Sequence, residues 1–161
     1  MHDKTMLIAA CLLSLSTDAM AMDSRAVALP KAADGRALDG RIELTDGAGG
    51  LRVDARIAGL PPGPHAMHIH AGGDCANLAQ PGEHFHVEGT HAHGDLPDLV
   101  ADAAGKATLT AQLPGLTVKD GAGSVAGRTV MIHALGTGAA GHNHVIACAV
   151  IARAATPQTT R

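Results

Sequence analysis

Histidines concentrate in residues 65–95, which hold seven of the eleven histidines of the chain. At the start of this segment, one residue separates His68 from His70. In an extended strand both side chains therefore point to the same face, about 7 Å apart at Cα. Neutral imidazole is a ligand for copper, zinc, nickel and iron. Together with His84, the histidines that follow it and Asp95, this spacing predicts a metal site.

The strand that carries this pair must turn its other face to a hydrophobic core. Met67 and Ile69 alternate with the two histidines, so we expect both to be buried behind them. A second segment shows the same alternation, with Val130 and Ile132 facing inward and His133 facing outward. We therefore predict that three outward-facing histidines on neighbouring strands meet at one place.

The rest of the chain reads as short strands separated by Gly- and Asp-containing turns. The expected strands are residues 26–31, 36–44, 51–57, 65–71, 106–113, 128–134 and 145–153. No segment after the N-terminal leader has a helical hydrophobic period. This pattern predicts an all-β fold, a single antiparallel β-sandwich or flattened barrel of about eight strands, over residues 22–161.

Composition narrows the function classes. Phe85 is the only aromatic residue, so the core must consist of small aliphatic side chains. The formal net charge is −3 and the lysines and arginines are dispersed. Nucleic-acid binding calls for a basic patch and, for single strands, stacking aromatics. We therefore expect no nucleic-acid partner.

The N-terminus carries an apolar run over residues 6–15, followed by Ala-Met-Ala at 19–21. This pattern predicts a signal peptide over residues 1–21, and hence a periplasmic or secreted protein. The run is too short to span a membrane. Two alternatives are a lipid anchor at Cys11, preceded by a shorter apolar stretch, and an unstructured cytosolic N-terminus.

Removing the leader leaves two cysteines, Cys75 and Cys148. In an oxidising compartment an even pair predicts one disulfide. It would close a loop of about 73 residues and contribute roughly 4–5 kcal/mol in the chain-entropy model. If the chain is not exported, two buried free thiols are the expected alternative.

Several motifs together resemble the copper/zinc superoxide dismutase family, in its bacterial, exported form. In order they are His65-Ala66-Met67-His68-Ile69-His70, Gly73-Asp74-Cys75, His84-Phe85, Gly94-Asp95-Leu96-Pro97, Gly127-Arg128-Thr129-Val130-Met131-Ile132-His133 and Ala147-Cys148-Ala149-Val150-Ile151. The resemblance implies a Greek-key β-sandwich. It also implies disproportionation of superoxide to oxygen and hydrogen peroxide, with copper cycling between two oxidation states, and a disulfide between Cys75 and Cys148.

The resemblance also assigns metal ligands. It implies copper at His68, His70, His84 and His133, with His84 shared between copper and zinc. Asp95 matches the family's aspartate zinc ligand, but the histidine expected three positions earlier is Ala92 here. We therefore expect zinc at His84, His91, His93 and Asp95, with His86 to spare. A copper-only site with solvated histidines is the alternative.

Two further departures concern the substrate path. The segment 134–145 is shorter than the family's charged loop and holds no charged residue, and Val145 stands where the family has an anion-guiding arginine. A positive funnel raises encounter rates with an anion by roughly 10 to 10³. We therefore expect slower dismutation that depends less on salt.

A second function remains open beside the dismutase. It is a copper- or zinc-storing protein on the same fold, supported by the surplus histidines His65, His86, His142 and His144. The sequence leaves the oligomeric state, monomer or homodimer, undecided.

Overall fold

The computed structural model describes residues 24–134 and 144–154. The expected signal peptide, Cys11 and His142 lie outside these residues. Eleven β-strands and no helix occur in the described part of the chain. The strands are β1 (Arg25–Ala28), β2 (Lys31–Ala32), β3 (Asp39–Gly47), β4 (Gly50–Ala58), β5 (Gly63–His65), β6 (Met67–His70), β7 (Leu99–Ala101), β8 (Lys106–Leu113), β9 (Thr129–His133), β10 (Val145–Val150) and β11 (Ala152–Arg153).

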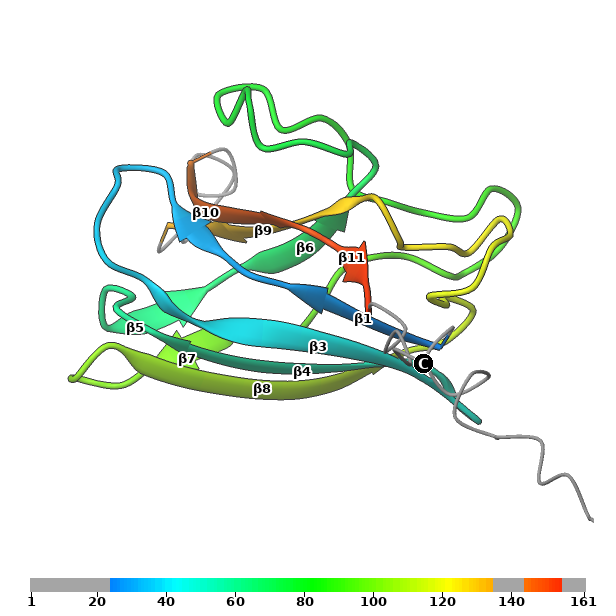
Figure 1. Ribbon diagram of the computed structural model, residues 1–161, viewed down its shortest axis with the longest axis horizontal. Coiled ribbons are helices and arrows are strands. Elements are labelled where there is room, and N and C mark those ends of the chain that lie inside the picture. Colours follow the sequence, from blue (N-terminus) through cyan, green and yellow to red (C-terminus); the bar gives the residue numbers. More distant parts are fainter. Residues whose placement is uncertain (1–23, 135–143, 155–161) are drawn as a thin grey trace, which may run out of the picture.

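The strands form two antiparallel sheets that face each other, as Figure 1 shows. The larger sheet has the order β11-β1-β3-β4-β8-β7-β5, and the smaller one has the order β2-β10-β9-β6. The chain crosses between the sheets at several points, including β5 to β6 and β8 to β9. This is the predicted all-β Greek-key sandwich. Among the described residues, no helix is long and apolar enough to cross a membrane.

The core lies between the two sheets and is made almost wholly of aliphatic side chains. Along β4, buried and exposed residues alternate, with Leu51, Val53, Ala55 and Ile57 facing inward. Such alternation is the pattern of a strand buried on one face only. Because each side chain is small, stability depends on many modest contributions, each of about 1.5–3 kcal/mol for a fully buried Val, Leu or Ile.

The strand bounds differ from the sequence prediction in two ways. The predicted strand 36–44 begins at Asp39 and runs on to Gly47, because the hairpin to β4 closes tightly at Gly47 and Gly50. The strand β7 (Leu99–Ala101) was missed, and the count of eleven exceeds the expected eight. The extra strands are pieces of two or three residues, which are too short to show a period in the sequence.

Strand β6 occupies the edge of the smaller sheet beside β9. The register pairs His68 with Met131 and His70 with Thr129. Met67 and Ile69 are fully buried in the main core, as predicted. The histidine side chains therefore face away from the sandwich interior.

The long segment between β6 and β7 covers this outer face (Figure 1). Its first part is fixed by the disulfide between Cys75 and Cys148, which confirms the predicted pairing. Cys148 lies on β10 and packs with Met131 and Val145 in a small satellite cluster under Leu78. The cross-link therefore ties the covering segment to the sheet that carries the histidines.

We predict that replacing both Cys75 and Cys148 with Ser lowers the free energy of unfolding by about 4 kcal/mol, because a 73-residue loop is no longer closed in the unfolded chain. At about 2–4 °C per kcal/mol, Tm should fall by roughly 10 °C. Calorimetry with and without reductant checks this. Reductant should lower Tm of the unaltered protein and leave the variant unchanged; an equal response of both would contradict the prediction.

Candidate metal centre

Four imidazoles converge on the outer face of the smaller sheet. His68, His70 and His84 have ring nitrogens that all lie within 4.8 Å of one another. The His133 ring centroid lies 5.0 Å from that of His68 and 5.6 Å from that of His70. His84 stands directly opposite His70 in an isolated β-bridge, which explains how a loop residue joins the strand ligands. The structure thus brings together all four predicted copper ligands.

These histidines face outward as predicted, but they are not exposed. His68, His70 and His133 are 6%, 1% and 0% exposed because the segment after β6 covers them. Burial lowers the pKa of His68 to about 3, with the positive charges of His84 and His133 adding to the effect. Burial also lowers the pKa of His70, and His84 contributes next. Burial therefore favours the neutral, metal-binding form of His68 and His70.

Contacts at Nδ1 fix the orientation of the His70 and His84 rings. The carbonyl oxygen of Gly82 lies 3.3 Å from His70 Nδ1, and a carboxylate oxygen of Asp95 lies 2.7 Å from His84 Nδ1. His70 Nε2 is buried without a hydrogen-bond partner among the described residues. A buried polar atom without a partner is costly, and a metal ion supplies one. This donor set fits copper.

Arg128 holds the covering segment against the sheet. Its guanidinium lies 3.6 Å from the ring centroid of Phe85, the residue next to His84. The same side chain donates hydrogen bonds to the carbonyl oxygens of Ala71 and Ser124, at 3.0 and 2.8 Å. Arg128, which directly precedes β9, therefore links the loop that holds Ser124 to the start of the covering segment and to the residue beside His84.

His65 has a structural place that the sequence did not reveal. It is 1% exposed, and its ring nitrogens lie 2.9 Å from the carbonyl oxygen of His133 and 2.7 Å from that of Pro61. The prediction that His65 is a surplus metal-binding histidine is wrong, because both of its ring nitrogens contact backbone carbonyl oxygens. The signal in the sequence is its odd position in the 65–70 motif. In an extended strand this position shares a face with Met67 and Ile69, not with His68 and His70.

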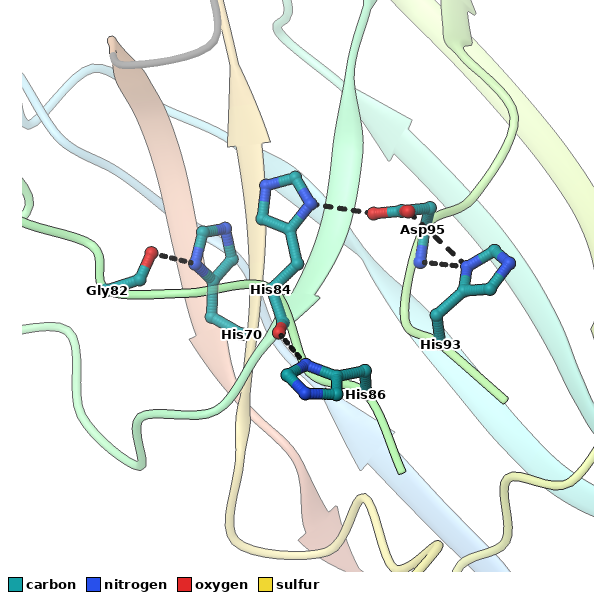
Figure 2. Close-up of polar contacts among 6 residues, drawn as sticks. All are labelled: His70, Gly82, His84, His86, His93 and Asp95. Carbon is teal, nitrogen blue, oxygen red and sulfur yellow. Dashed lines mark hydrogen bonds and ion pairs between the residues drawn. The ribbon is translucent and has the colours of Figure 1, made fainter. Parts of the chain in front are cut away.

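A second group of donors lies on a hairpin beyond His84, as Figure 2 shows. Asp95 stands between His84 and His93, whose Nδ1 lies 3.4 Å from its second carboxylate oxygen. His86 lies opposite His93 in a β-bridge. His91 is exposed and makes no hydrogen bond or ion pair with the described residues. Of the four predicted zinc ligands, the structure thus connects His84, His93 and Asp95.

Val145 stands opposite His133, beside the metal ligands. A β-bulge between Val145 and Ala147 places its side chain on the outer face, where it is 4% exposed and packs on Met131 and Cys148. A bulge inserts one unpaired residue and so reverses the alternation of faces. His144 is exposed at the strand start. An apolar side chain therefore occupies the position nearest to the imidazole cluster on β10.

Comparisons with known proteins agree with this geometry. The family model for copper/zinc superoxide dismutase (SODC) matches residues 38–151. A superoxide dismutase [Cu-Zn] of Photobacterium leiognathi is 34% identical over 152 residues, covering 83% of this chain and 84% of that protein. One of Caulobacter vibrioides is 32% identical over 126 residues, covering 68% and 72%. One of Legionella pneumophila is 32% identical over 107 residues, covering 60% and 64%.

We predict that the metal-free protein loses stability as pH falls from about 6.5 toward about 3. In this window the unfolded chain binds a proton at His68 that the folded chain does not, so acid favours unfolding. His68→Gln should flatten the dependence. Urea midpoints across this pH range check it, and a wild-type curve that is flat or rises toward acid would contradict the prediction.

Proposed function

Because this chain belongs to the copper/zinc superoxide dismutase family, we propose that it is an exported superoxide dismutase. The reaction converts two superoxide anions and two protons to oxygen and hydrogen peroxide. The observation that carries the proposal is the convergence of four imidazoles, of which His68, His70 and His84 have ring nitrogens within 4.8 Å of one another and His68, His70 and His133 are buried. Such a cluster on rigid strands suits a redox-active ion with one open position for a small anion.

In this proposal His68, His70, His84 and His133 hold the copper. Copper, when bound, would supply one-electron redox chemistry: it would accept an electron from one superoxide, which leaves as oxygen, and return it to a second, which with two protons becomes hydrogen peroxide. The contact of His84 Nδ1 with Asp95 turns the other nitrogen, Nε2, toward the cluster. If His84 leaves the copper during the reaction, its Nε2 can take up a proton and pass it to the reduced oxygen.

Zinc is the second metal of the family, and the donor chemistry here fits it. Two imidazoles and a carboxylate, from His84, His93 and Asp95, lie in contact in a half-exposed setting. Zinc takes nitrogen and oxygen ligands at about 2.0–2.2 Å in tetrahedral sites. A metal on the far side of His84 would fix that ring more firmly than a single hydrogen bond. His91 completes the set predicted from the sequence.

Export is supported by the disulfide, because such bonds persist in oxidising compartments. The signal peptide over residues 1–21 and a periplasmic or secreted location stay part of the proposal. The alternative function, metal storage on the same fold, is favoured by one observation. Val145 gives the copper side of β10 an apolar residue where the family has a positive charge.

Copper-loaded protein should catalyse dismutation, and His70→Ala should lose both copper and activity because one of four ligands is missing. His144→Ala is the matched control, since His144 is an exposed histidine. Pulse radiolysis beside metal analysis checks this. Stoichiometric copper without turnover in the unaltered protein would sink the dismutase proposal and favour storage.

Val145→Arg should raise the rate per bound copper by about tenfold at low salt, because a cation beside the open position attracts an anion. The rate of this variant should fall with ionic strength, whereas that of the unaltered protein should change little. Val145→Met is the neutral control for altered packing against Met131 and Cys148. Equal rates for the arginine and methionine variants, or a steep salt dependence of the unaltered protein, would count against the prediction.

A further inference from the structure

The hairpin that carries the second donor group has a defined register. Val87 donates a backbone hydrogen bond to Ala92, and Gly94 donates one to Phe85. These two bonds flank His86 and His93, which therefore form a non-hydrogen-bonded antiparallel pair. In such pairs the Cα atoms lie only about 4.5 Å apart and the side chains point the same way. His86 and His93 thus share one side of the hairpin.

His84 and Asp95 lie on the same side as His86 and His93. Each is one step, that is two residues, closer to β6 along its arm. Phe85 and Gly94, the residues between the two steps, are buried on the opposite side. Beyond them the arms separate to pair with β6, with His84 opposite His70 and Asp95 opposite His68. The side chains of His84 and Asp95 nevertheless meet at 2.7 Å. Figure 2 shows two donors on each arm, His84 with His86 and His93 with Asp95.

The backbone positions of these four residues are close enough for their side chains to reach a single ion. Residues two apart on one arm lie about 7 Å apart at Cα, and a residue four apart lies about 13 Å away. A histidine Cα can lie at most about 6.5 Å from a bound zinc, given side-chain length and a bond of about 2.0 Å. His86 lies directly opposite His93, and Asp95 is two residues from His93 along the other arm, so His86 and Asp95 are diagonal neighbours. His91 lies two such steps from Asp95 along its arm, about 13 Å at Cα, which exceeds the combined reach of a histidine and the shorter aspartate.

We propose that His86, rather than His91, is the fourth zinc ligand, completing a set with His84, His93 and Asp95. This inference rests on the proposed function, in that it specifies the second metal of the same site. In this set, each arm of one short hairpin contributes two ligands, in place of ligands from the family's longer zinc loop. It also explains how the site tolerates Ala92, which is buried behind the hairpin at the position of the missing histidine.

The His86 ring must turn to reach the ion, and only weak contacts hold it in its present orientation. Its Nδ1 lies 3.5 Å from the His84 carbonyl oxygen, and its Nε2 lies 3.5 Å from a carboxylate oxygen of Glu88. Both contacts are long, and the side chain is 56% exposed. Exposed side chains change rotamer within nanoseconds. The cost of the movement is therefore small compared with a zinc–nitrogen bond.

The test compares His86→Gln with His91→Gln, two exposed histidines on the same hairpin. The zinc affinity of copper-loaded protein is measured by chelator competition, and metal content by mass spectrometry. His86→Gln should weaken zinc binding by at least about 100-fold, since loss of an outer hydrogen-bond partner alone costs 10–100-fold. His91→Gln should keep the affinity of the unaltered protein. Both variants should retain copper and the disulfide, which controls for folding.

Three results would overturn the inference: loss of zinc in His91→Gln with retention in His86→Gln, equal loss in both, or no zinc bound by the unaltered protein. None of these depends on turnover. Dismutation by a protein that binds no zinc would remove this inference and leave the proposed function intact. If the two variants bind zinc as expected but the copper-loaded protein has no dismutase activity, the inference about His86 stands and the proposed function fails.

Discussion

The two-residue alternation of β6 is the constraint on which the site depends. A strand has only two faces, and in β6 one of them belongs to the main core through Met67 and Ile69. The other face must then carry His68 and His70, at a fixed spacing. A shift of one residue in its pairing with β9 would exchange imidazoles and core side chains. The anchoring of two aliphatic residues therefore also fixes two metal ligands.

Because β6 lies at the edge of the smaller sheet, it can also bind the hairpin that carries His84 and Asp95. Because β9 pairs with only one of its sides, the other side is free to bond the hairpin. The Ile69 amide donates to the carbonyl of Gly94 and its carbonyl accepts from Phe85, so one residue receives both arms. Gly94 permits this approach, since a Cβ there would meet the Ile69 carbonyl oxygen at 2.7 Å. The unpaired edge thereby brings His84 and Asp95 to the cluster.

The features that depend on the two-residue alternation of strands could be predicted from the sequence. The burial of side chains by a segment distant in the sequence could not. The alternation in 65–70 and 128–133 predicted which face His68, His70 and His133 occupy, and the even cysteine pair predicted the disulfide. It could not predict that the rings are buried, because the covering segment has no period of its own. Local period alone could not place Val145, since a single bulge reverses the alternation of faces without leaving a signal in the sequence. The resemblance to the family aligned it with the arginine position, and it lies opposite His133.

The depressed basicity of the buried rings has a consequence for copper uptake. An ordinary exposed imidazole in a mildly acidic medium carries a proton, which an incoming ion must first displace. Burial lowers the pKa of His68 to about 3, so this ring carries no proton in a mildly acidic medium. At this ligand, an incoming copper ion therefore has no proton to displace in a mildly acidic medium. The desolvation that costs the empty fold stability also prepares it to capture its ion.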